Sequence, residues 1–122
     1  MNGGARTWYF PDGYLPKKVN NGPMEAHEAL MLFNTNETAV DVLIDIYFSD
    51  RDPVKGISVK VSAERVHTIR LDHPDELAGT AIPQLTQYSL RIRASKNIVC
   101  QFGRLDTTQN AMAYYVGIGY AE

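Results

Sequence analysis

The stretch at residues 40–48, V-D-V-L-I-D-I-Y-F, limits what this chain can fold into more than any other segment. It is rich in β-branched and aromatic side chains and contains neither Gly nor Pro, which predicts an extended strand of about 30 Å. Every second residue from Val40 to Phe48 is apolar, whereas Asp41 and Asp45 lie on the opposite face. This is the period of a strand and not that of a helix. One face of the strand therefore belongs in a core, and other strands must pair with it.

Further segments with the same alternation predict the other strands. They are residues 6–10, 27–34, 56–61, 64–71, 88–94, 97–105 and 111–120. Polar turn residues predict two hairpins, one joining 27–34 to 40–48 and one joining 88–94 to 97–105, with its bend near Ser95. Both faces of the strand at 27–34 are apolar beyond its first two residues, so we expect it to be central and covered on both sides.

The segments between these strands predict loops and almost no helix. Two prolines and Gly22 make residues 14–23 an irregular loop, with the Asn20–Asn21 pair inside it. Residues 72–83 allow one helical turn at 74–77. About eight short strands with loops between them predict an all-β fold, a single-domain antiparallel β-sandwich spanning residues 1–122.

The last predicted strand has one bulky face and one nearly bare face. Ala111, Ala113, Gly117 and Gly119 alternate with large side chains. Glycine weakens a strand unless another backbone comes close, so we expect a neighbouring chain to pack here. The alternative is a short helix at 109–114 with a threonine at its N-terminus.

Composition narrows the class of protein. The 122 residues are 44% hydrophobic, which suffices for a core without metals or disulfides, and Cys100 has no second cysteine to pair with. A net charge of -2 provides no basic field, which argues against a nucleic-acid partner. Neither a charged leader nor an apolar run of about 20 residues is present, so we expect a cytoplasmic protein without membrane insertion.

The sequence offers little for catalysis or for a metal. His27 and Glu28 resemble the start of a zinc-binding helix, but Met31 stands where a second histidine is needed. Cys100 alternates with Ile98 on the predicted inward face, which indicates burial and not reactivity. We therefore expect no enzymatic activity, no metal and no cofactor. The rival hypothesis is a small hydrolase or isomerase that uses His27 and Asp106.

A polar pocket is a second hypothesis. Trp8 lies near one strand end, and Arg104 and Asp106 lie near another. An aromatic ring binds the apolar face of a ligand, while charged groups bind its hydroxyls. The alternative is an internal ion pair between Arg104 and Asp106, with Trp8 in the core.

Several short motifs follow one another with a recognisable order and spacing. They are G-Y-L-P at 13–16, N-G-P at 21–23, H-E at 27–28, I-Y-F-S-D-R-D-P-V at 46–54, A-E-R at 63–65, R-L-D at 70–72, I-P at 82–83 and R-L-D at 104–106. Taken together, they resemble the sensory rhodopsin transducer family, a family of small soluble proteins. The resemblance covers nearly the whole chain.

This resemblance implies a β-sandwich of about eight strands, a homotetramer, and a non-enzymatic signalling adaptor on the cytoplasmic side of a membrane receptor such as a sensory rhodopsin. It also implies a small-molecule site, because the fold is similar to carbohydrate-binding sandwiches. The alternative function is therefore a module that binds a polar, sugar-like metabolite without a rhodopsin partner. The positions that match the family near such a site are Trp8, His27, Glu28, Arg65, Arg104 and Asp106.

Overall fold

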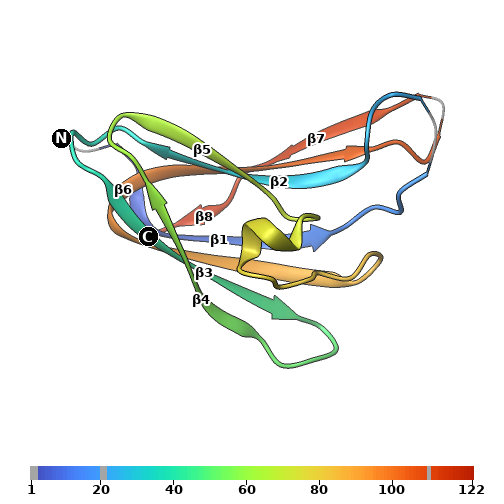
Figure 1. Ribbon diagram of the computed structural model, residues 1–122, viewed down its shortest axis with the longest axis horizontal. Helices are drawn as coiled ribbons and strands as arrows, with labels where there is room; N and C mark the ends of the chain where they lie inside the picture. The colour runs from blue at the N-terminus through green and yellow to red at the C-terminus, as the bar shows by residue number, and fades with distance from the viewer. Residues whose placement is uncertain (1–2, 20–21, 110) are drawn as a thin grey trace.

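The computed structural model describes residues 3–19, 22–109 and 111–122, and almost all regular structure in them is β (Figure 1). These residues form eight strands, and every pairing is antiparallel. The strands are β1 (Ala5–Tyr14), β2 (His27–Asn34), β3 (Val40–Phe48), β4 (Val54–Val61), β5 (Arg65–Arg70), β6 (Gln87–Asp106), β7 (Ala113–Gly117) and β8 (Tyr120–Ala121). The predicted all-β antiparallel fold is confirmed, and so is the short helical turn, η1 (Pro74–Leu77).

The 20-residue strand β6 organises the fold because it belongs to both layers. Its first half lies between β1 and β3, in a sheet of order β4-β3-β6-β1-β8, here called sheet A. Its second half lies between β2 and β7, in a sheet of order β5-β2-β6-β7, here called sheet B. Figure 1 shows β5, β2 and β7 in one layer and β1, β3 and β4 in the other.

Both predicted hairpins are wrong. The segment from 88 to 105 is one strand, and the polar residues Ser95–Asn97 lie where it passes from sheet A to sheet B. This triplet contains neither Gly nor Pro, so nothing in it requires a turn. β2 and β3 do not pair with each other, and each pairs with β6 in a different sheet. The connection between them is fixed by buried Asn34, whose Nδ2 donates to the carbonyls of Thr38, Val61 and Ser62.

The core fills the space between the two sheets. The inward face predicted for residues 40–48 is confirmed, with four of its five side chains fully buried: Val40, Val42, Ile44 and Ile46. The same alternation runs through both halves of β6, whose buried side chains include Tyr88, Leu90, Ile92, Ile98, Cys100 and Phe102. The predicted burial of Cys100 is confirmed, and burial raises the pKa of its thiol to about 12.

The C-terminal segment is extended, but it forms two strands, β7 and β8, where one was predicted. The alternative helix at 109–114 does not form over the described residues, since β7 begins at Ala113; residue 110 lies outside the described ranges. A Cβ at Gly119 would lie 2.7 Å from the Phe10 ring and 2.8 Å from the Tyr9 carbonyl oxygen. The close approach that this glycine predicts is therefore present, but its own chain makes it and not a neighbouring one.

The first strand is longer than predicted. β1 continues past Pro11 to Tyr14, with a register shift between Phe10 and Gly13. After it the chain is irregular as far as β2, as the loop prediction for 14–23 requires, although Asn20 and Asn21 lie outside the described residues.

Candidate functional site

Glu28 is the centre of a polar network between the two sheets. Its carboxylate is fully buried, and Arg104 from the neighbouring position on β6 donates Nε to Oε2 at 2.6 Å. Tyr88, at the other end of β6, donates its hydroxyl to Oε1 at 2.6 Å, and the Tyr14 backbone N–H donates at 3.0 Å. Since Tyr88 lies in sheet A and Glu28 in sheet B, this carboxylate joins the two layers.

Local sequence explains how Tyr88 reaches the network. A Cβ at Gly13 would lie 2.5 Å from the Tyr88 ring, so the ring passes over the backbone where β1 lacks a side chain. Arg104 also donates to the Asp12 carbonyl at 3.0 Å, and its guanidinium lies 5.5 Å from the centre of the Tyr115 ring. The bulge in β1 therefore brings its backbone close to both partners of Glu28.

Burial dominates the electrostatics of this network. It raises the pKa of the Glu28 carboxyl, and the hydrogen bonds from Tyr88 and Arg104 oppose the rise. Burial, with the adjacent Glu28, also raises the pKa of Tyr88 well above its ordinary value. Because water does not reach Glu28, the network is suited to holding the two layers in register. Arg104, about a fifth exposed, is the member that a ligand can reach.

The structure brings four of the six predicted site residues to one end of sheet B. Glu28 and Arg104 pair directly, and His27 lies opposite Leu105 with its Nδ1 2.8 Å from the Glu25 carbonyl. Asp106 accepts hydrogen bonds from the backbone N–H and the hydroxyl of Thr108, which lower its pKa. Arg104 thus forms its ion pair with Glu28, where the sequence suggested Asp106.

Trp8 and Arg65 lie elsewhere. The Trp8 indole donates to the carbonyls of Ala5 and Ile98, and Arg104 lies six positions beyond Ile98 on β6, which is about 20 Å of strand. Arg65 pairs with Asn34, at the opposite end of β2 from His27. One chain therefore does not bring Trp8 or Arg65 to the Arg104 end of the molecule.

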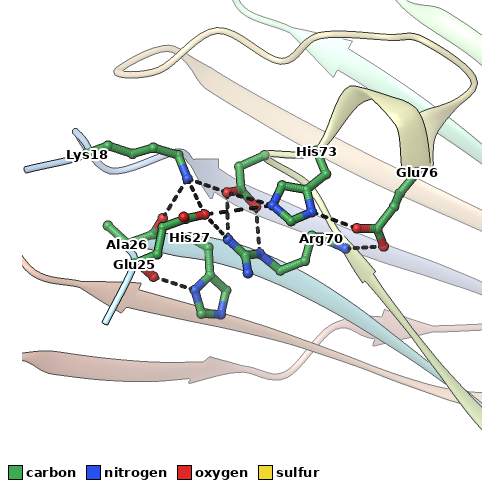
Figure 2. A network of polar contacts seen from close by, with 8 residues as sticks. Lys18, Glu25, Ala26, His27, Arg70, His73 and Glu76 are labelled. Atoms are coloured by element: carbon green, nitrogen blue, oxygen red, sulfur yellow. Dashed lines mark hydrogen bonds and ion pairs between the residues drawn. The ribbon is translucent and has the colours of Figure 1, made fainter. Parts of the chain in front are cut away.

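A second polar cluster lies beside the first, where the loop after β1 meets the end of β5 (Figure 2). Lys18 donates to Glu25 at 2.8 Å and to Asp72 at 2.5 Å, and Arg70 donates to the same two carboxylates at 2.7 Å. His73 lies 3.7 Å from both carboxylates through Nε2 and contacts Glu76 through Nδ1 at 2.8 Å.

This second cluster has the ligand types of a metal site, since one ligand atom from each of Glu25, Asp72 and His73 lies within 4.8 Å of the others. Lys18 and Arg70 already neutralise the two carboxylates, so an ion would have to displace two cations. The arrangement instead fastens the loop to sheet B. Sequence reasoning missed the cluster because its members are far apart in the chain, although R-L-D at 70–72 was among the motifs.

Two hollows lined by described residues border these networks. One holds about 30 Å³, is lined in part by Phe10, Phe102 and Tyr115, and has room for a water molecule or two. The other holds about 360 Å³ between Lys18 and Glu25, with Val19, Gly22, Pro23 and Met24. Only the second is large enough for a small polar metabolite.

Comparison with known proteins identifies the class to which this sandwich belongs. The family model described as the Anabaena sensory rhodopsin transducer matches residues 3–121, and the chain belongs to this family. The crystal structure of Thermotoga maritima 1070 is similar, with 33% identity, a TM-score of 0.86, and coverage of 99% of this chain and 97% of that one.

A structure described as the Anabaena sensory rhodopsin transducer is 30% identical to the chain, with a TM-score of 0.70. The match covers 84% of this chain and 89% of that one. No curated protein matches the sequence significantly. In the described part of the chain, no helix is long and apolar enough to cross a membrane.

Proposed function

We propose that this protein is a non-enzymatic signalling adaptor of the sensory rhodopsin transducer type, which acts as a homotetramer on the cytoplasmic side of a membrane receptor. The observation that carries the proposal is the family match over residues 3–121, together with a 30% identical transducer structure. A sensory rhodopsin is the partner that this family name suggests.

The chemistry of the described residues supports a role without catalysis. Cys100 is buried, and its thiol has a pKa of about 12, so it is not a nucleophile near neutral pH. The Glu28 carboxylate is enclosed by its own partners. The rival hydrolase would use His27 and Asp106, and turnover that disappears in H27A would favour it over the adaptor.

Binding to a reconstituted receptor tests the adaptor. A sensory rhodopsin from the same organism, placed in lipid nanodiscs, should bind the protein at micromolar concentration, and illumination should change the affinity. Empty nanodiscs are the control for binding to lipid. Equal signals from empty and rhodopsin-loaded nanodiscs, in darkness and in light, would contradict the proposal.

The alternative function is binding of a small polar or sugar-like ligand, and the hollow of about 360 Å³ beside Lys18 and Glu25 favours it. Its volume lies in the range of ligand pockets, and both an ammonium and a carboxylate line it. None of the six positions that match the family lines this hollow. His27, Glu28, Arg104 and Asp106, at one end of sheet B, remain the predicted binding residues of a second site, from which Trp8 and Arg65 are distant on one chain. Arg104 is the accessible one at the Glu28 network.

A thermal-shift screen of sugars and metabolites tests the alternative. A ligand at 100 times its dissociation constant should stabilise the protein by about 2.7 kcal/mol. Loss of the thermal shift in K18A would place the ligand in the hollow beside Lys18. Loss of the shift in R104A would place it at the Arg104 end of sheet B. K60A, which removes an exposed lysine on β4, is the matched control. The absence of any stabilising ligand would leave the adaptor as the supported function.

A further inference from the structure

β5 is an edge strand of sheet B and pairs with β2 alone. Its first four residues, Arg65–Thr68, are exposed, although their side chains alternate between the two faces of the sheet. Ile69 is the buried residue of the strand. Over the first four residues the strand therefore has little contact with the core, and its main contact is the ladder with β2. We call the side of β5 that faces away from β2 the β5 edge.

The hydrogen bonds at the end of β5 show which backbone groups point to this edge. The Leu71 N–H donates to the Glu28 carbonyl at 2.9 Å, which continues the register of β5 with β2. The Arg70 N–H instead donates to the Glu76 carboxylate at 3.1 Å, away from β2. The Arg70 carbonyl accepts the His73 N–H at 3.3 Å. Arg70 therefore turns both of its backbone groups to the β5 edge, where the turn around η1 occupies them.

Val66 and Thr68 present their backbone to the same edge. In an antiparallel pair, successive residues turn their N–H and C=O groups alternately toward and away from the partner strand. By this alternation, His67 and Ile69 bond to β2. Thr68 and Val66, two and four positions before Arg70, face the β5 edge. Within residues 3–19, 22–109 and 111–122, no hydrogen bond reaches the backbone groups of Val66 or Thr68. Four backbone groups are therefore open to another strand.

Other edges of the sandwich carry features that discourage a further strand, and β5 lacks them. Natural edge strands are protected by lysines, by bulges or by their short length. On β4, Lys55 and Lys60 are exposed, and the register of this strand with β3 is interrupted. β8 has two residues. The register of β5 with β2 runs unbroken from Arg65 to Arg70, and β5 contains no lysine, glycine or proline. The β5 edge is therefore able to accept a strand.

Basic side chains select which strand the β5 edge can accept. Arg65 and His67 are exposed on one face of β5, and Val66 is 62% exposed on the other. Arg65 donates to the Glu64 carbonyl at 3.0 Å, and in the described part of the chain it forms no ion pair. A second copy of this edge would set basic side chains against each other, which destabilises a pair of strands. Carboxylates at the matching positions of another strand would neutralise them. β7, at the opposite edge of sheet B, has no charged residue that could select a partner.

We propose that an extended acidic segment of a second protein docks on the β5 edge as an additional strand of sheet B, antiparallel like every other pairing in the fold. Its backbone exchanges hydrogen bonds with Val66 and Thr68. Its carboxylates lie beside Arg65 and His67, and an apolar side chain between them lies on the Val66 face. The partner therefore alternates acidic with apolar residues. The proposal deepens the proposed function, on which it rests in that an adaptor must hold a partner.

Amide hydrogen exchange of the full chain, followed by NMR, tests the proposal with a defined probe. The probe is a capped synthetic peptide of about seven residues, in which two glutamates flank a central valine. Without peptide, the amides of Val66 and Thr68 should exchange fast. The amides of His67 and Ile69 should exchange slowly, because they donate to β2. A saturating concentration of peptide should slow exchange at Val66 and Thr68 about tenfold or more and leave the other two amides unchanged.

A matched pair of charge reversals tests the role of Arg65. R65E places a carboxylate beside the glutamates of the peptide, so the dissociation constant of the peptide should rise about tenfold. K60E reverses an exposed basic residue on β4, the edge strand of sheet A, and should leave the dissociation constant unchanged. A peptide with lysines in place of both glutamates should bind the wild type about tenfold more weakly than the glutamate peptide. Sodium chloride should weaken binding of the glutamate peptide, because the charge pairs are exposed.

A backbone substitution tests the strand addition itself. T68P removes one N–H from the β5 edge and leaves the ladder with β2, because an edge strand tolerates proline where the nitrogen faces solvent. The dissociation constant of the peptide should again rise about tenfold. Far-UV circular dichroism identifies a T68P chain that fails to fold. A peptide N-methylated at its central valine then provides the same test on the wild type.

The outcomes are distinct. Slowed exchange confined to Val66 and Thr68, with binding that R65E weakens and K60E does not, supports the proposal. Protection of these two amides without peptide, increasing with protein concentration, would assign the β5 edge to a second copy of the chain and overturn it. No binding of the peptide, or binding that R65E and T68P leave unchanged, would also overturn it. The nanodisc experiment tests the adaptor separately, so either proposal can fail while the other stands.

Discussion

The outer faces of the two sheets differ in chemistry, although one strand runs through both. In its first half, β6 points Ser89, Arg91 and Arg93 outward from sheet A. In its second half, it points Val99, Gln101, Gly103 and Leu105 outward from sheet B. Its inward residues are apolar from Leu90 to Ala94 and from Ile98 to Phe102, and the inward Arg104 near its end pairs with buried Glu28. Both halves belong to one strand and face one core. The change in the outward residues therefore reflects a difference between the surroundings of the two outer faces.

The sheet A face satisfies its own charges. Asp45 is fully buried beneath the guanidinium groups of Arg91 and Arg93, which donate to it at 2.8–3.0 Å, and the Gly56 backbone N–H donates to it at 2.9 Å. Arg91 also lies 5.8 Å from the centre of the Tyr47 ring. The charges of this face therefore pair with one another, whereas the outer face of sheet B exposes apolar side chains such as Phe33 and Val66.

The largest loss of stability is expected at Glu28, whose buried carboxylate joins the two sheets. E28A should lower the free energy of unfolding by about 3 kcal/mol, because it leaves the Arg104 guanidinium and the Tyr88 hydroxyl without their buried acceptor. Urea denaturation at fixed protein concentration measures the loss. E28Q keeps one acceptor oxygen and should lose about half as much. A loss below about 1 kcal/mol in E28A would contradict the joining role.

Substitution of Asp45 tests whether its ion pairs with Arg91 and Arg93 stabilise sheet A. D45A should cost about 2 kcal/mol, less than a fully enclosed ion pair, because both arginines remain partly in water. D45N retains an acceptor for the Gly56 N–H and should cost less. Sedimentation of D45A should match the wild type. If D45A dissociated the assembly, the two faces would not be independent.

Low pH tests how much the second polar cluster, around Asp72 at the edge of sheet B, stabilises the fold. Burial opposes ionisation of Asp72, yet the hydrogen bonds from Arg70 and Lys18 hold its pKa well below the usual range. The unfolded chain takes up this proton near pH 4 and the folded chain does not, so the stabilisation is present above about pH 4 and is lost as the pH falls further.

The measurement is a comparison of D72N with the wild type at two pH values. D72N should be less stable by about 1 kcal/mol at pH 7, since Lys18 is partly exposed, and the difference should narrow at pH 3. E25Q, at a more exposed member of the same cluster, is the control and should show a smaller change. A difference that stays constant between the two pH values would mean that Asp72 is not the titrating group.

The sequence predicted the strands well because their signal is local. Alternation within a segment identifies which side chains face the core, and the buried Val40, Val42, Ile44 and Ile46 follow from it directly. Pairing is not local. The hairpin predicted at Ser95 is wrong because polar residues mark exposure as readily as they mark a turn, and here they mark the passage of β6 between sheets.

The candidate site could be predicted only in part. Glu28 and Arg104 were selected through family motifs, and the structure pairs them. Tyr88 begins the strand predicted at residues 88–94, but its bond to Glu28 depends on the packing of one sheet against the other, which no alternation pattern encodes. Trp8 was grouped with Arg104 because both lie near predicted strand ends, and the true length of β6 separates them.

The smallest effect is expected from an exposed ion pair on sheet A, and it sharpens the comparison. Lys60 Nζ lies 3.5 Å from Asp41 Oδ1, and both side chains are about 70% exposed. Water screens such a pair, so K60A should change the free energy of unfolding by less than about 0.5 kcal/mol and should leave self-association unchanged. Urea denaturation and sedimentation of K60A beside D45A measure both quantities.

The ion pairs of Asp45 and of Lys60 involve neighbouring strands of sheet A. A large loss of unfolding free energy in K60A would therefore mean that charge anywhere on sheet A stabilises the fold. A loss confined to D45A would assign that stabilisation to the carboxylate beneath the arginines.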